Sequence, residues 1–105
     1  MNAMTRLTIP LPRISAIEVV DHLVLRVTWC AGIRNGRTDT VELSPLVNVL
    51  KFYRPIRDKS FFRIVHLIED GRAIAWGDDD KIDMPAASLE QLAEESIRRR
   101  KASSH

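Results

Sequence analysis

The sequence has a single cysteine, only four glycines, and no apolar run long enough to cross a membrane. Because Cys30 stands alone, an intrachain disulfide and a cluster of thiolate metal ligands are both excluded. A spanning helix needs roughly 18 consecutive apolar residues, and the first residues lack the apolar core of a secretory signal. We therefore expect no membrane segment and a cytoplasmic location, whose reducing environment suits an unpaired cysteine.

A large net charge is also missing, since 16 Lys and Arg residues nearly balance 14 Asp and Glu residues. The resulting formal charge of +2 is too small to indicate nucleic-acid binding across the whole surface. The charges are nevertheless separated along the chain. Residues 1–63 carry ten basic and five acidic side chains, residues 64–95 carry two and nine, and residues 96–105 carry four and none. We expect a molecule with oppositely charged surfaces.

The length of 105 residues, with 45% hydrophobic and 29% charged residues, favours one ordinary globular domain. Pro10 and Pro12 hold the opening of the chain extended. We therefore predict a flexible leader over residues 1–13, a single α+β domain over residues 14–100 and a flexible tail over residues 101–105. Met4 is an alternative to Met1 as the true start.

Alternating apolar residues predict a first β-hairpin over residues 14–20 and 23–29, with Leu23, Leu25, Val27 and Trp29 on one face. The turn dipeptide Asn35-Gly36 introduces a third strand over residues 38–43. Ser44-Pro45 predicts a capped helical turn that ends by Pro55.

A second hairpin is predicted over residues 62–69 and 72–76, with Asp70-Gly71 as its turn and a short edge strand following at residues 81–83. Ser88 and Gln91 match a capping box, so a helix should begin at Ser88. Its apolar face comprises Leu89, Leu92, Ala93 and Ile97. The fold class is thus α+β, with two antiparallel hairpins forming a sheet packed with a short helix and a C-terminal helix.

The order and spacing of several short motifs in the second half support a resemblance to a known family. These motifs are Pro55-Ile56-Arg57-Asp58, Phe62-x-x-Val65-x-Leu67, Gly71-x-x-Ile74-x-Trp76, and Ile82-Asp83 followed by Leu89. Over residues 14–92 the chain resembles the bacterial family called domain of unknown function 2442. The resemblance implies a small α+β fold with an antiparallel sheet. It also implies an antitoxin-like role in a toxin–antitoxin pair, because family members lie beside another uncharacterised protein.

The chain departs from some members of that family in two respects. Some relatives carry a helix-turn-helix domain after this region, whereas one predicted helix follows here, so a role in reading DNA is not transferred. The segment from Cys30 to Asn35 is longer than the usual turn of the family.

Five residues are candidates for contact with a protein partner. Arg57 and Asp58 lie between the two hairpins, where they form either an internal ion pair or a partner contact. Trp76 suits either the core or an interface. Asp79 and Asp80 belong to an acidic turn whose spacing lacks the pattern of a calcium loop, so we interpret it as a solvated surface and expect no metal.

Two alternative functions come from other classes. Nucleic-acid binding would use a basic helix end formed by Arg98, Arg99, Arg100 and Lys101, and could extend to Arg54, Arg57 and Lys59, although interleaved aromatic residues are lacking. An enzyme would combine His66 with Cys30 or Ser60, yet no nucleophile motif is present. We therefore expect no catalytic residue and no cofactor.

The sequence thus favours a non-enzymatic protein-binding module, whose partner is encoded by a neighbouring gene. The separation of charge also suggests that the chain associates with a second copy of itself. The basic tail of one copy can meet the acidic turn of another, which predicts a homodimer that also shares some apolar area.

Overall fold

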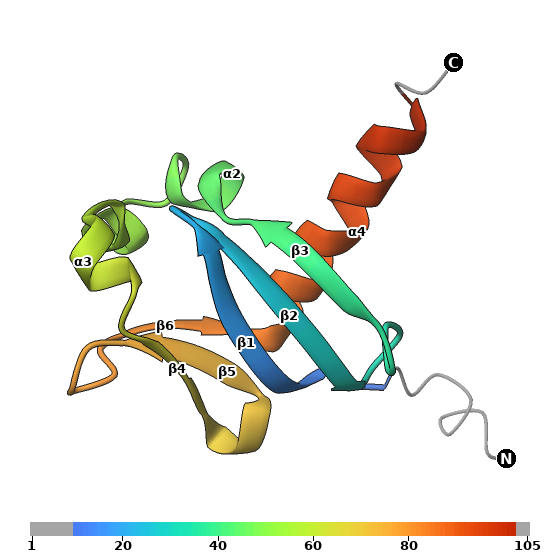
Figure 1. The fold of residues 1–105 in the computed structure, drawn as a ribbon, viewed down its shortest axis with the longest axis horizontal. Coiled ribbons are helices and arrows are strands. Elements are labelled where there is room, and N and C mark those ends of the chain that lie inside the picture. Colours follow the sequence, from blue (N-terminus) through green and yellow to red (C-terminus); the bar gives the residue numbers. More distant parts are fainter. Residues whose placement is uncertain (1–9, 103–105) are drawn as a thin grey trace, which may run out of the picture.

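Two three-stranded antiparallel sheets, several short helical elements and a long C-terminal helix build an α+β fold, as the computed structural model shows (Figure 1). The structure describes residues 10–102. Most of the predicted leader and the last three residues of the predicted tail lie outside this range. The expected fold class is confirmed.

The first sheet has the order β1-β2-β3, formed by Arg13–Asp21, Val24–Ala31 and Thr38–Glu42. Side chains alternate between its two faces, and Val27 pairs with Ile17 on β1 and with Asp39 on β3. The predicted inward face of β2 is confirmed for Leu25, Val27 and Trp29, which are fully or almost fully buried, whereas Leu23 lies in the turn before β2 and is half-buried.

The second sheet has the order β4-β5-β6, formed by Val65–Ile68, Ala73–Trp76 and Ile82–Pro85. The predicted second hairpin and its edge strand are therefore confirmed in outline. The two hairpins do not join into one sheet, however. Each hairpin instead pairs with a third strand of its own, because the chain between β3 and β4 forms helical turns and gives no strand to bridge them.

Three short helical elements connect the sheets: α2 (Ser44–Val47), the 3-10 helix η1 (Lys51–Arg57) and α3 (Lys59–Phe62). Three predictions for this segment were wrong. Leu43 occupies the N-cap of α2 without a side-chain bond, so Ser44 is no cap. Pro55 lies inside η1 and does not end a helix. Phe62 closes α3 and does not begin a strand.

The C-terminal helix α4 (Ala86–Ala102) starts two residues before the predicted position. Ala86 donates its backbone N–H to the carbonyl of Arg72 at 2.8 Å, so β6 leads directly into the helix. The predicted capping box is wrong, because Ser88 lies inside the first turn and the Gln91 amide donates to Glu95 at 3.1 Å.

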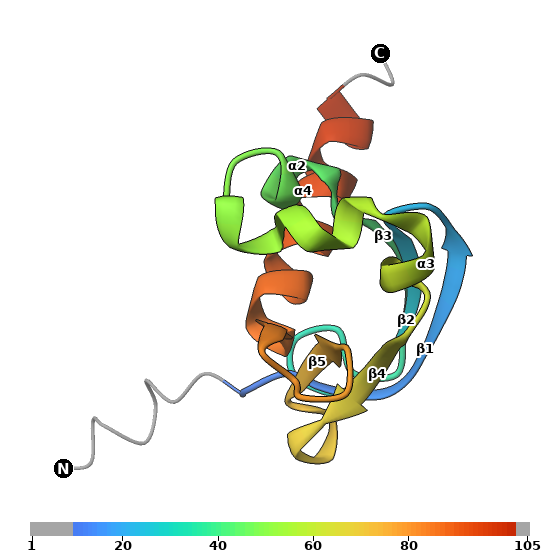
Figure 2. The same ribbon diagram turned by 90° about the vertical axis from the view of Figure 1, so that its left-hand side faces the viewer.

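The core lies between α4 and the first sheet, which stand on opposite sides of the molecule in Figure 2. The predicted apolar face of α4 is confirmed for Leu89, which is fully buried, and for Leu92 and Ala93, which are nearly so, whereas Ile97 is only half-buried. The helical connector covers one end of this core, and β4 and β5 lie at the other end (Figure 2). None of the helices that the structure describes is long and apolar enough to cross a membrane.

Candidate functional site

Two of the candidate interaction residues, Arg57 and Asp58, form polar contacts within the chain. Arg57 is exposed and donates to the side-chain oxygen of Asn48 at 3.4 Å. Asp58 accepts hydrogen bonds from the backbone N–H groups of Ser60 and Phe61, which makes it the N-cap of α3. The sequence offered an ion pair between Arg57 and Asp58 as one reading, but each of the two residues contacts a different group.

Trp76 is a core residue, as one of the two interpretations held. Its side chain is fully buried, and its indole N–H donates to the carbonyl of Phe62 at 3.1 Å. Its ring also stacks on that of Phe62 at a centroid distance of 6.3 Å. In this conformation Trp76 has no surface with which to contact a partner.

The acidic turn after β5 is exposed and partly paired. Asp79 accepts the backbone N–H of Lys81 at 3.2 Å, and its carboxylate lies 3.7 Å from the ammonium of the same lysine. Asp80 lies 2.7 Å from Nε2 of His66, whose Nδ1 is 3.1 Å from the carbonyl of Ile64. These contacts raise the pKa of His66, the bond to Ile64 more than the bond to Asp80. Across the described residues, no cluster of three or more potential ligands could hold a metal ion.

The basic end of α4 is exposed from Arg98 to Arg100. Arg100 donates to the hydroxyl of Ser96 at 3.5 Å. Arg99 and Arg100 also line a shallow cavity with Thr40 and Glu42 of β3, so this end of the helix lies over the edge of the first sheet. The side chain of Lys101 lies outside the described part of the chain.

The residues of the imagined enzyme site belong to different parts of the surface. Cys30 is exposed on β2, because it alternates with the inward-facing Trp29. Cys30 borders a cavity beside Asp70, and Ser60 borders another beside the β1–β2 turn. His66 contacts Ile64 and Asp80 and lines neither of these two cavities. The structure does not bring the three residues together.

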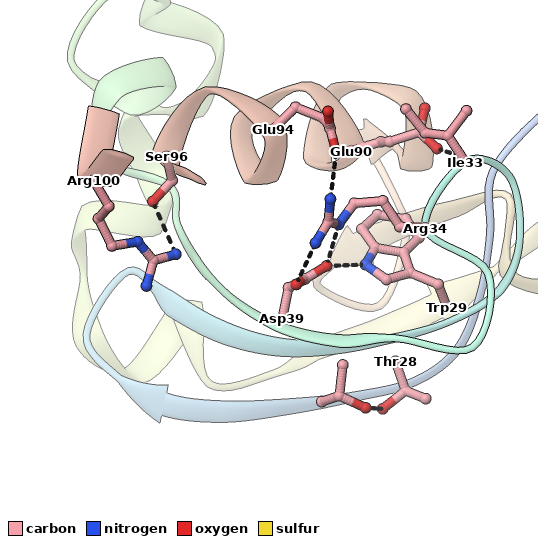
Figure 3. Close-up of polar contacts among 10 residues, drawn as sticks. Thr28, Trp29, Ile33, Arg34, Asp39, Glu90, Glu94, Ser96 and Arg100 are labelled. Carbon is pink, nitrogen blue, oxygen red and sulfur yellow. Dashed lines mark hydrogen bonds and ion pairs between the residues drawn. The ribbon is translucent and has the colours of Figure 1, made fainter. Parts of the chain in front are cut away.

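A polar network that sequence reasoning missed lies between the first sheet and α4 (Figure 3). Arg34 is only 6% exposed, and its guanidinium bonds both carboxylate oxygens of Asp39 and one of Glu94 on α4. Asp39 also accepts the indole N–H of Trp29 at 2.8 Å. Hydrogen bonding to Arg34 holds the pKa of Asp39 below its usual value, and the same contact raises the pKa of Arg34.

This network explains the long loop after β2. The backbone N–H of Ile33 donates to Glu90 at 3.3 Å, so the loop reaches α4 at two points (Figure 3). A Cβ atom on Gly32 would lie 2.8 Å from the Glu90 carboxylate and from Pro12, and the positive φ of 99° also favours glycine there. The loop therefore holds the helix against the sheet. One signal was present in the sequence, since Asp39 falls on the inward face of its strand, where a carboxylate needs a partner.

Two surface features were not singled out from the sequence. The first is a stretch of exposed apolar side chains that follows α2 and extends into the start of η1, namely Val49 at 76%, Leu50 at 43% and Phe52 at 51% exposure, which we call the 49–52 surface. The second is a cavity of about 370 Å³ between the β1–β2 turn and α3, which we call the turn cavity. The turn cavity is bordered by both apolar and charged side chains.

Comparison of the chain with protein-family models, curated proteins and solved structures found no match. The fold and these surfaces define a small α+β domain.

Proposed function

We propose that this chain is a non-enzymatic protein-binding module that contacts its partner through the 49–52 surface. The observation that carries the proposal is the exposure of three large apolar side chains within four residues. Contiguous apolar side chains that remain in water commonly mark interaction sites. The ring of Phe52 makes an edge-to-face contact with the ring of Tyr53, at a centroid distance of 5.0 Å. Because this contact already restricts the side chain, binding to a partner would cost little further conformational entropy.

The charge around this surface indicates the chemistry of the partner. Lys51, Arg54 and Arg57 are all exposed on η1, and the only acidic residue between residues 43 and 68 is Asp58. A partner surface with acidic residues around an apolar groove would complement this arrangement. The charges would mainly speed and orient the encounter, and burial of Phe52 would supply most of the affinity.

The partner we favour is the product of a neighbouring gene, with this chain as the antitoxin-like member of a pair in the cytoplasm. The resemblance to the family of domain of unknown function 2442 supports this reading, and the mechanism would be occlusion of a surface on the partner. Arg57 would belong to the interface. The sheet edges are weaker candidates, because η2 (Glu69–Gly71) approaches β1 closely and α4 lies along β3.

The test is co-expression with the adjacent gene product, followed by measurement of the affinity of the purified pair. We expect Phe52→Glu to weaken the complex at least about tenfold, because a carboxylate would replace an apolar anchor. Leu11→Glu is the matched control, since Leu11 is 77% exposed and lies outside the 49–52 surface. Absence of a complex, or equal weakening by both variants, would contradict the proposal.

A further inference from the structure

We propose that the turn cavity is a binding site for a small organic phosphate, separate from the 49–52 surface. The cavity lies between the β1–β2 turn and α3, and its volume of about 370 Å³ falls within the range of sites that hold small molecules. Its walls combine apolar and basic groups. Neither the fold nor the proposed protein interface requires this combination.

The basic wall comes from α3 and the residue that follows it. Lys59 and Arg63 are four residues apart, which places them on the same side of this helical turn. Both are exposed, and neither forms an ion pair with another described residue. The hydroxyl of Ser60 borders the cavity beside them. Two cations and a hydroxyl give a set of donors that suits the three terminal oxygens of a phosphate better than the two of a carboxylate.

The β1–β2 turn contributes the imidazole of His22, whose Nδ1 lacks a hydrogen-bond partner. Nδ1 of His22 is buried and makes no hydrogen bond within the described part of the chain, which is unusual for a buried polar atom. The ring packs edge-to-face on Phe62 at a centroid distance of 5.7 Å, so its position is well defined. The ring also borders the cavity, and an imidazole carries an N–H group that can donate a hydrogen bond to an anionic ligand.

The remaining walls indicate that the ligand is more than inorganic phosphate. Val19, Val20 and Phe62 provide apolar surface for an aromatic or aliphatic body. Asp21 also borders the cavity, and one of its oxygens already accepts the backbone N–H of His22 at 2.7 Å. Because this carboxylate would repel a second anionic group, we expect one phosphate at the Lys59 and Arg63 end and a neutral body beside Asp21.

The experiment is an NMR titration of the full-length protein at low salt with phenyl phosphate, inorganic phosphate and phenol. We expect saturable shifts with phenyl phosphate at His22, Ser60 and their neighbours, and weaker binding of both other compounds. Lys59→Gln combined with Arg63→Gln should weaken binding at least tenfold. Arg54→Gln, which removes an exposed cation outside the cavity, should change it less than twofold.

Several outcomes would overturn this inference. They are the absence of saturable shifts in the cavity, equal binding of phenol or of inorganic phosphate, and equal weakening by Arg54→Gln, which would indicate diffuse attraction. Lys59→Gln alone serves as the test if the double variant does not fold. Phe52→Glu should leave phosphate binding unchanged, so failure here is distinguishable from failure of the proposed protein interface.

Discussion

The guanidinium of Arg34 and the carboxylate of Asp39 form a two-bond ion pair beneath α4, with Nη2 2.9 Å from Oδ1 (Figure 3). Glu94 joins the pair from the helix, and the indole of Trp29 on β2 donates to Asp39. One guanidinium thus joins a loop, the strand that follows it and a helix 60 residues later in the sequence. Because the guanidinium is buried, its removal would leave the carboxylates without a cationic partner and would destabilise the fold.

Replacing Arg34 by Leu should destabilise the domain by about 3 kcal/mol, since it leaves the carboxylate of Asp39, which is only 15% exposed, without its cationic partner. Arg26→Leu is the matched control, because Arg26 pairs with Glu18 on the exposed face of the sheet. This control should cost less than about 1 kcal/mol. Denaturant unfolding measures both. Equal effects of the two substitutions would show that burial of the Arg34 pair has no energetic importance.

Protonation of His66 should stabilise the folded chain slightly. Its pKa is raised in the folded state, so the stabilisation is complete below the unfolded value of about 6.5 and is lost as pH rises through the higher folded value. The ring and Asp80 are both nearly half exposed, which limits the effect to about 1 kcal/mol or less.

Asp80→Asn tests this assignment by NMR titration of the His66 ring. The pKa should fall towards 6.5 but remain above it, because the bond to the Ile64 carbonyl is the larger cause and persists. Asp79→Asn is the control, since Asp79 contacts Lys81. A larger fall with Asp79→Asn than with Asp80→Asn would contradict the assignment.

An aspartate introduced into the first sheet should destabilise the fold more than one introduced into the second sheet. Val27 is fully buried, so Val27→Asp should unfold a domain whose total stability is about 5–15 kcal/mol. Val65 is only half-buried, which allows a carboxylate at that position to reach water. Val65→Asp should therefore lower the melting temperature without abolishing folding. A normal melting curve for Val27→Asp would show that the inward face of β2 is misassigned.

Truncation after Ile97 should affect association before stability. The removed arginines are exposed, whereas Leu89, Leu92 and Ala93 remain in the core, so the melting temperature should fall by less than about 5 °C. We propose that a homodimer forms between the basic tail of one copy and the acidic turn of the other, and truncation should weaken it, most visibly at low salt. Sedimentation of the two chains provides the measurement. A monomer in both cases, or an unfolded truncated chain, would contradict the proposal.

Local patterns predicted the strands and their inward faces well. The alternation through Leu25, Val27 and Trp29 requires only a pleated strand with one covered side, which any neighbouring element can satisfy. Helix starts were predicted less well. Ser88 has the sequence of a cap, but the backbone bond from Ala86 to Arg72 starts the helix earlier, and that bond depends on a distant strand.

Neither proposed binding site was visible as a pattern in the sequence. The residues of the turn cavity come from the β1–β2 turn and from α3, almost 40 residues later, and no local spacing relates them. The 49–52 surface reads as an ordinary apolar stretch, and only the packing around it leaves Phe52 in water. Exposure is a property of the assembled chain.

By itself, the sequence determined the α+β class, most strand positions and the apolar face of the last helix, because these depend on side-chain periodicity and turn residues close along the chain. Tertiary structure decided that the hairpins form two sheets and that Arg34 is buried between Asp39 and Glu94. These outcomes depend on which elements meet. Long-range packing and the need of buried charges for partners select that arrangement, and neither acts within a short window of sequence.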